Sequence, residues 1–167
     1  MVDTLILEEQ LNLGMATIMA RKGATAVSIG AILGIDLPTG PGAIFAGDLT
    51  VIGMGPECWL AVKANAAPDF IERLTDALAG LASVSDQSSG YAVWEIAGSR
   101  ARTLLQRGAF IDFHDEVFKT GSAVTTLIAH IGTIIWQVDD RPGYYVATFR
   151  SYASSFRHWL DQTAKAF

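Results

Sequence analysis

The chain has one cysteine, few charged residues and no long apolar run. Cys58 alone cannot form an internal disulfide, and a single thiol fits a reducing compartment, where it is most often a small core side chain. Cysteine and histidine residues do not recur at the spacing of metal ligands. The sequence therefore predicts neither a disulfide scaffold nor a metal site.

Basic residues are also scarce. The 167 residues include 12 Lys and Arg against 17 Asp and Glu, which gives a formal net charge of −5. The Lys and Arg residues are scattered, whereas proteins that bind nucleic-acid phosphates gather them on one face. Nucleic acid is therefore not an expected partner.

Neither a signal peptide nor a membrane span is expected. The chain opens with Asp3, Glu8 and Glu9 rather than with a basic segment followed by a long apolar run, so we expect a cytoplasmic protein. Residues 1–12 have no periodic apolar face. We interpret them as a tail or arm of a single domain that spans residues 1–167.

The sequence holds no motif that would mark a catalytic centre. It lacks a Gly-x-Ser-x-Gly nucleophile elbow, and Cys58 has no neighbouring base in sequence. The Gly53-Met-Gly55 stretch could be compared with a dinucleotide-binding loop, but a predicted strand follows it where phosphate binding needs a helix N-terminus. We therefore assign no catalytic and no cofactor-binding residue to this chain.

Four titratable side chains crowd into five consecutive positions: Asp112, His114, Asp115 and Glu116. They could form an acid/base pair or an oxygen-rich metal site. Charges on loops are usually solvated, however, so we favour a solvated loop in which Ile111 and Phe113 point inward.

The chain is rich in apolar residues. Hydrophobic residues make up 50% of it and charged residues 17%, and the mean hydropathy is +0.31. One interpretation is that part of the apolar excess faces a partner. The other is a compact core with many Gly and Ala residues.

A predicted β-α unit lies at the centre of the chain. In the strand Tyr91–Ala97 the apolar residues Ala92, Trp94 and Ile96 alternate, and Gly98 ends the strand. Ser99 is the predicted N-cap of the following helix, and Gly108 its left-handed stop. One apolar face of that helix is formed by Ala101, Leu104 and Leu105.

The other predicted elements indicate a mixed architecture. Strands are predicted over 15–20, 50–53, 58–63, 123–129, 133–138 and 144–149, with turns at 130–132 and 139–143. Helices are predicted over 69–81, after a Ser151 cap, and along a stripe of small residues: Val27, Gly30, Ala31 and Gly34. Strands and helices do not alternate strictly, so the predicted class is α+β. The two halves each offer strands around a helix and then a second helix, which suggests a duplicated unit.

Several short motifs follow one another in an order that characterises one family. They are Ser85-Asp-Gln-Ser-x-Gly90, Ile96-x-Gly-x-x-Ala-Arg-x-Leu-Leu105, Ile111-Asp-x-His114, Phe118-x-x-Gly121, Thr126-x-x-Ala-His-Ile-Gly132, Trp136, and Phe149-Arg-Ser-x-Ala-x-Ser-Phe-x-x-Trp-Leu160. With this ordered set, the chain resembles the gamma subunit of heterotetrameric sarcosine oxidase over most of its length. No single motif is diagnostic alone, and the N-terminal third matches more loosely.

The resemblance implies a fold and a role. The fold would be two interleaved β/α subdomains with antiparallel sheets, as in the folate-binding fold of glycine-cleavage aminomethyltransferases. The role would be an accessory, non-catalytic subunit that assembles with alpha, beta and delta subunits, alpha being in direct contact. FAD, FMN, NAD and tetrahydrofolate would lie on those sister subunits. The alternatives are a stand-alone tetrahydrofolate or small-molecule binding module, or the equivalent subunit of an N-methyl amino acid dehydrogenase.

Arg150 is the predicted structural anchor of the chain. It follows an apolar strand and precedes the last helix, so its guanidinium starts close to packed core and needs a carboxylate. The candidates are Asp112, which we prefer, and Asp86. The alternative is a surface arginine whose loss costs under about 1 kcal/mol.

Overall fold

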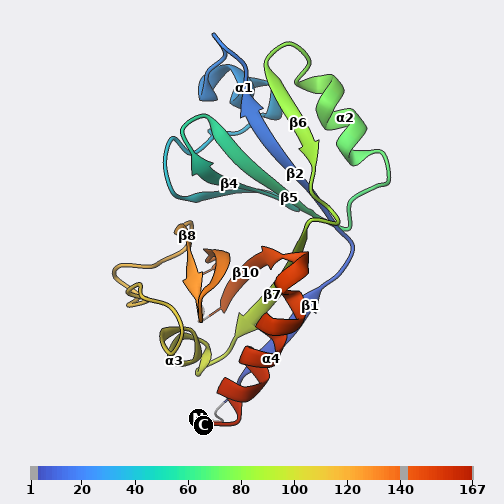
Figure 1. Cartoon of the computed structure of the whole chain (residues 1–167). Coiled ribbons are helices and arrows are strands. Elements are labelled where there is room, and N and C mark those ends of the chain that lie inside the picture. The colour runs from blue at the N-terminus through green and yellow to red at the C-terminus, as the bar shows by residue number, and fades with distance from the viewer. Residues whose placement is uncertain (1–3, 140–142, 167) are drawn as a thin grey trace. The chain divides into compact units, whose positions relative to one another are not determined.

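The computed structural model describes residues 4–139 and 143–166, and its helices and antiparallel strands confirm the predicted α+β class. The chain divides into two compact units (Figure 1). Unit 2 is the continuous stretch Asn12–Gly90, whereas unit 1 combines Met1–Leu11 with Tyr91–Phe167. No helix in the two described ranges is long and apolar enough to cross a membrane.

Unit 2 is a five-stranded antiparallel sheet with two helices. Its elements are β2 (Leu13–Ala20), α1 (Ala26–Leu33), β3 (Ala43–Ala46), β4 (Leu49–Gly55), β5 (Cys58–Ala64), α2 (Phe70–Ala77) and β6 (Ala82–Asp86). The strand order is β3-β4-β5-β2-β6. The predicted strands over 15–20, 50–53 and 58–63 are confirmed, and the last two form a hairpin.

Both helices of unit 2 pack on the same apolar cluster of the sheet. Helix α1 begins at a capping box, in which Thr25 Oγ1 accepts from Ser28 N–H and Ser28 Oγ accepts from Thr25 N–H, and it ends at Gly34 with φ 69°. The predicted helix is therefore confirmed, but of its predicted stripe of small residues only Gly30 is buried. Ile29 is the residue that is buried in the core, whereas Val27 is 82% exposed.

Unit 1 is a second five-stranded antiparallel sheet. Its elements are β1 (Ile6–Gln10), β7 (Tyr91–Ala97), α3 (Ala101–Gln106), β8 (Ala123–Ile128), β9 (Ile131–Trp136), β10 (Gly143–Phe149), the 3₁₀ turn η1 (Arg150–Tyr152) and α4 (Ala153–Ala164). The strand order is β1-β7-β10-β9-β8. The predicted strands over 91–97, 123–129, 133–138 and 144–149 are confirmed within one to two residues at each end.

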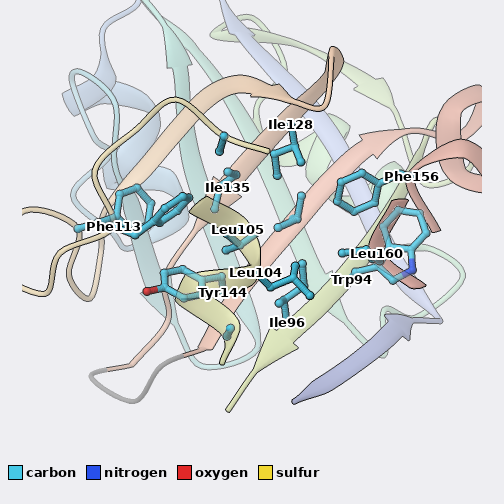
Figure 2. Close-up of a cluster of buried hydrophobic side chains, with 14 of the residues drawn as sticks. Trp94, Ile96, Leu104, Leu105, Phe113, Ile128, Ile135, Tyr144, Phe156 and Leu160 are labelled. Carbon is cyan, nitrogen blue, oxygen red and sulfur yellow. The ribbon is translucent and has the colours of Figure 1, made fainter. Parts of the chain in front are cut away.

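Helices α3 and α4 cover one face of the unit 1 sheet, and their side chains meet the alternating residues of β7 and β10 (Figure 2). Trp94 and Phe156 lie with their ring centroids 5.0 Å apart, which joins β7 to α4. Leu104 and Leu105 of α3 are fully buried in the same cluster, as their spacing predicts. Gly108 does not adopt the predicted left-handed conformation. It is needed because a Cβ there would lie 2.5 Å from Trp159 Cζ2.

Three strands were not predicted, and one of them, the edge strand β3, pairs antiparallel with β4. Ile6–Gln10, within the stretch that we interpreted as a tail or arm, pairs antiparallel with β7 as the edge strand β1. Ala82–Asp86 pairs with β2 as the edge strand β6. Strands β1 and β6 are short and partly exposed, so neither has the apolar alternation that identifies an inner strand.

The predicted helix caps and one turn also differ from the structure. Ser99 is not the N-cap of α3: Arg100 has that position, and Ser99 Oγ accepts a hydrogen bond from Thr4 N–H at 3.3 Å. Ser151 does not cap α4, because it lies inside η1 and the helix begins two residues later. The turn between β8 and β9 is formed by Ala129 and His130, one residue earlier than predicted. The predicted turn at 139–143 lies partly outside the described residues.

The two units share one order of elements. The strands β7, β8, β9 and β10 have the same places in the unit 1 sheet as β2, β3, β4 and β5 in the unit 2 sheet, and α3 and α4 correspond to α1 and α2. The chain thus consists of two equivalent halves, β1 to α2 and β6 to α4. The first strand of each half, however, pairs in the sheet of the other half: β1 with β7, and β6 with β2. This exchange makes the two units interleaved, as the resemblance implies.

Candidate functional site

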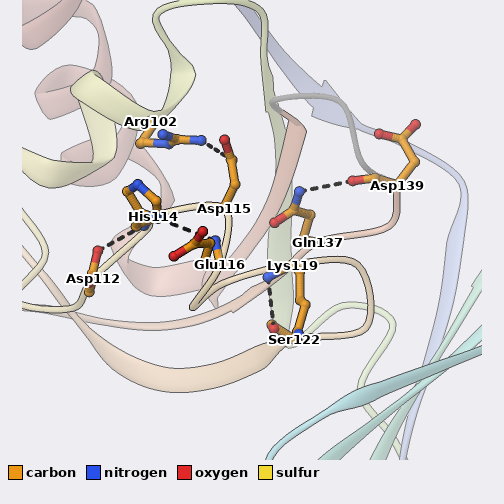
Figure 3. Close-up of polar contacts among 9 residues, drawn as sticks. All are labelled: Arg102, Asp112, His114, Asp115, Glu116, Lys119, Ser122, Gln137 and Asp139. Atoms are coloured by element: carbon orange, nitrogen blue, oxygen red, sulfur yellow. Dashed lines mark hydrogen bonds and ion pairs between the residues drawn. The ribbon is translucent and has the colours of Figure 1, made fainter.

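The four neighbouring titratable residues noted in the sequence are Asp112, His114, Asp115 and Glu116. They lie on the loop between α3 and β8, here called the 109–122 loop (Figure 3). Asp112 Oδ1 accepts a hydrogen bond from His114 N–H at 2.8 Å, and His114 Nδ1 accepts one from Glu116 N–H at 3.3 Å. Asp115 forms an ion pair with Arg102 of α3. These side chains therefore fold the loop back on itself and attach it to a helix.

The core side of the loop is apolar. Phe113 is fully buried, and its ring packs edge-on against Phe118 and Tyr144, with centroid distances of 5.3 Å in both cases. Ile111 is partly buried against the same cluster. The favoured interpretation, a solvated loop with Ile111 and Phe113 inward, agrees with this geometry. In the described ranges no group of three or more His, Cys, Asp or Glu side chains could hold a metal ion.

The far end of the loop extends the β8–β9 pairing. Gly121 N–H donates to the Gln137 carbonyl at 3.0 Å, and Gln137 N–H donates to the Ser122 carbonyl at 3.1 Å. Ser122 Oγ also accepts from Lys119 N–H at 3.0 Å. The polar groups at this end are thus used to hold the loop against the sheet (Figure 3).

Arg150 lies at the end of β10 and makes two polar contacts. Its Nη1 donates to Glu9 Oε1 of β1 at 2.9 Å, and its Nη2 donates to the Tyr91 carbonyl of β7 at 2.6 Å. The predicted type of partner, a carboxylate, is present, but the predicted residues are wrong. Asp112 accepts from its own loop, and Asp86 Oδ1 accepts from Ser88 N–H at 2.8 Å. Glu9 was missed because it lies in the stretch that we interpreted as a tail.

The Ser-Asp-Gln-Ser motif closes the end of β6 onto β2. Gln87 N–H donates to the Met15 carbonyl at 2.8 Å, and Ser88 Oγ accepts from Met15 N–H at 3.0 Å. The hydrogen bonds from the backbone and the hydroxyl of Ser88 lower the pKa of Asp86. Asp86 and Ser88 also line a hollow of about 320 Å³ in unit 2, together with Phe70 of α2.

Gly53 and Cys58 lie on the neighbouring strands β4 and β5 of unit 2. Gly53 lies in β4 and is followed by β5 rather than by a helix, which agrees with our rejection of a phosphate loop. A Cβ at Gly53 would lie 2.1 Å from the Gly40 carbonyl oxygen, so the residue permits a close backbone approach. Burial raises the pKa of the Cys58 thiol, which makes it a poorer nucleophile at neutral pH.

The paired sheets with interleaved strands define the class of fold. The structure is similar to glycine cleavage system aminomethyltransferase T from Bartonella henselae, with a TM-score of 0.69 and 12% identity over 95% of this chain and 45% of that chain. It is also similar to a chain of the heterotetrameric sarcosine oxidase from Corynebacterium sp. U-96 in complex with pyrrole 2-carboxylate. In that case the TM-score is 0.87 and the identity 24%, over 98% of this chain and 85% of that chain.

The sequence comparisons identify the family. The profile of the sarcosine oxidase, gamma subunit family matches residues 18–166, and the chain belongs to this family. The sarcosine oxidase subunit gamma of Corynebacterium sp. (strain P-1) is 28% identical over 142 residues, which cover 81% of this chain and 67% of that protein. The family and the predicted aminomethyltransferase-like fold are therefore both confirmed.

Proposed function

We propose that this chain is an accessory, non-catalytic subunit of a heterotetrameric, flavin-dependent sarcosine oxidase and that it acts in assembly and stabilisation. The observation that carries the proposal is the family match over residues 18–166. The TM-score of 0.87 to a chain of a heterotetrameric sarcosine oxidase, over 98% of this chain, supports it. The complex would work in the cytoplasm.

In this proposal the chemistry takes place on the sister subunits. They oxidatively demethylate sarcosine, pass the one-carbon unit to tetrahydrofolate, and hold FAD, FMN and NAD. The large alpha subunit is in direct contact with this chain, and beta and delta complete the complex. The supporting observation is that the titratable side chains of the 109–122 loop bond to the loop and to α3 rather than converging on a common centre.

The experiment is co-expression with the alpha-type subunit of the same organism, followed by size-exclusion chromatography at micromolar concentration. We expect the two chains to elute together, and the chain purified alone to show no flavin absorbance. Separate elution would contradict the accessory role, and stoichiometric flavin on the isolated chain would contradict the placement of the cofactors.

A second candidate function is a stand-alone module that binds tetrahydrofolate or another small molecule. The hollow of about 320 Å³ with Asp86 and Ser88 at its wall favours it. Equilibrium dialysis of the purified chain against tetrahydrofolate separates the two functions, because an accessory subunit should bind no tetrahydrofolate. The equivalent subunit of an N-methyl amino acid dehydrogenase is distinguished by assaying the co-expressed complex with sarcosine and with other N-methyl amino acids.

A further inference from the structure

Phe110 is the most exposed large apolar residue described in the structure, with 94% of its surface accessible. It stands on the 109–122 loop between two residues that are buried, Ala109 at 7% exposure and Phe113 at 0%. Its ring is thus directed into solvent although the backbone on either side is attached to the core.

The backbone beside Phe110 is held in place. Ala109 N–H donates to the Leu105 carbonyl at 2.9 Å, and Ala109 forms an antiparallel bridge with Ile128 at the end of β8. Further along the loop, the N–H groups of Val117 and Phe118 both donate to the His114 carbonyl at 2.8 Å. A fixed backbone lowers the conformational entropy that the loop loses on binding, so the loop presents Phe110 preorganised for contact.

The exposed Phe110 ring buries little area in the fold itself, so most of its apolar surface is available to an interface. A phenylalanine buries about 150–250 Å² when it is enclosed, and aromatic residues, phenylalanine included, are enriched in protein interfaces. Val117, on the same loop, is 59% exposed and adds a second apolar side chain. The loop therefore presents apolar surface that the described part of unit 1 leaves uncovered.

The charged residues within 110–118 have one sign, and the basic residues Arg107 and Lys119 lie outside this segment. Between positions 110 and 118 the sequence has three carboxylates and no Lys or Arg: Asp112, Asp115 and Glu116. Arg102 forms an ion pair with Asp115, so Asp112 and Glu116 are the other two carboxylates of the segment that contains the exposed apolar side chains. A complementary surface would have an apolar socket with Lys or Arg residues at its rim.

We propose that Phe110 is the anchor of a docking surface, formed by the 110–117 segment, that inserts into a basic-rimmed apolar socket of the alpha-type subunit. This inference rests on the proposed function for the identity of the partner. The face of α1 around Val27 is also exposed, but it has no charged residue in Ala26–Leu33 and therefore provides a matched control.

The test measures binding of the full chain to the alpha-type subunit by biolayer interferometry, with wild type, Phe110→Ala, Glu116→Gln and Val27→Ala. We expect Phe110→Ala to weaken binding at least about tenfold, as truncation of a central aromatic anchor does. Glu116→Gln should weaken binding about two- to fivefold at low salt and flatten its salt dependence. Val27→Ala should remain within twofold of wild type.

Each outcome has a defined meaning. If wild type binds and Phe110→Ala binds within twofold of it, the docking surface is refuted while the proposed function stands. If wild type does not bind the alpha-type subunit at all, the proposed function fails and the inference with it. If Phe110→Ala instead abolishes self-association of the isolated chain in sedimentation velocity, the occupant is a second copy and the inference is wrong. Urea midpoints of all variants should match wild type, and should that of Phe110→Ala fall, Glu116→Gln decides the question because it changes no packing.

Discussion

The guanidinium of Arg150 lies 2.9 Å from Glu9, so that a contact across 141 residues of sequence joins the end of β10 to the first strand of the chain. The same side chain also reaches the Tyr91 carbonyl at the start of β7. The chain passes from one unit to the other at two points, after Leu11 and after Gly90. Glu9 and Tyr91 are close in sequence to these two points. Arg150 therefore attaches both crossing segments to the sheet of unit 1.

Replacing Arg150 by Met should lower the free energy of unfolding by about 1 kcal/mol. The arginine side chain is 50% exposed and Glu9 33%, so the ion pair alone is weak, and most of the loss comes from the Tyr91 carbonyl, which loses a charged donor. The measurement is the urea midpoint. Arg73→Met is the matched control, because the Arg73 side chain is 77% exposed and its ion pair with Asp69 is long, at 4.0 Å. An equal urea midpoint for wild type and Arg150→Met would contradict the structural role of Arg150.

Replacing Gly108 by Ala should destabilise the chain by about 1–3 kcal/mol. The added Cβ would lie 2.5 Å from Trp159 Cζ2 and 2.9 Å from Ile128 Cγ2, so α4 or β8 would have to move. Gly132→Ala is the control, since a Cβ there meets nothing within 4 Å and should change stability by less than about 0.5 kcal/mol. Thermal unfolding followed by circular dichroism measures both. Equal melting temperatures for the two variants would contradict the close approach of α4.

Replacing Tyr144 by Phe should leave stability unchanged or raise it by up to about 1 kcal/mol. The Tyr144 ring is fully buried, and its hydroxyl has no hydrogen-bond partner among the described residues. Removing an unpaired buried hydroxyl relieves a desolvation cost. Tyr144→Ala, which removes the ring as well, should instead cost about 3–5 kcal/mol. A loss above about 1 kcal/mol for Tyr144→Phe would reveal an ordered water on the hydroxyl.

The stability of the chain at alkaline pH should depend on Tyr145. Burial, followed by the negative charges of Glu95, Asp139 and Glu8, raises the pKa of Tyr145. The neutral phenol is thus favoured in the folded state, so its contribution is complete below the unfolded pKa of about 10 and is lost as the pH rises through the folded pKa.

Urea midpoints at pH 8, 10 and 11 test this dependence. Wild type should lose more stability over the series than Tyr145→Phe, which cannot ionise. Tyr152→Phe, which removes a phenol that is 50% exposed, is the control and should follow wild type. Parallel pH profiles for wild type and Tyr145→Phe would show that the raised pKa does not contribute.

Local patterns predict the inner parts of the two sheets. In β7 the alternation of Ala92, Trp94 and Ile96 identifies both the strand and its buried face, because an inner strand carries its burial pattern in its own sequence. The hairpin of β4 and β5 is equally local, since Pro56 and Glu57 place a turn between two apolar runs.

Long-range pairing accounts for what could not be predicted. The sequence of β1, with Glu8 and Glu9, has no local sign of a strand, and only the distant partner β7 makes it one. Because β1 was missed, Glu9 could not be considered as the partner of Arg150. The predicted cap at Ser99 was also wrong: Arg100 is the N-cap, and the Ser99 hydroxyl accepts from Thr4 N–H, 95 residues away.

The exchange of first strands between the two halves also determines how the sheets assemble. A chain with one half alone could complete its sheet only with the edge strand of a second molecule, and its folding would depend on protein concentration. Here the residues between α2 (Phe70–Ala77) and β6 (Ala82–Asp86) join the two halves covalently. This short connection gives each exchanged strand a high effective concentration near its partner, so that what would be a bimolecular association becomes an intramolecular step.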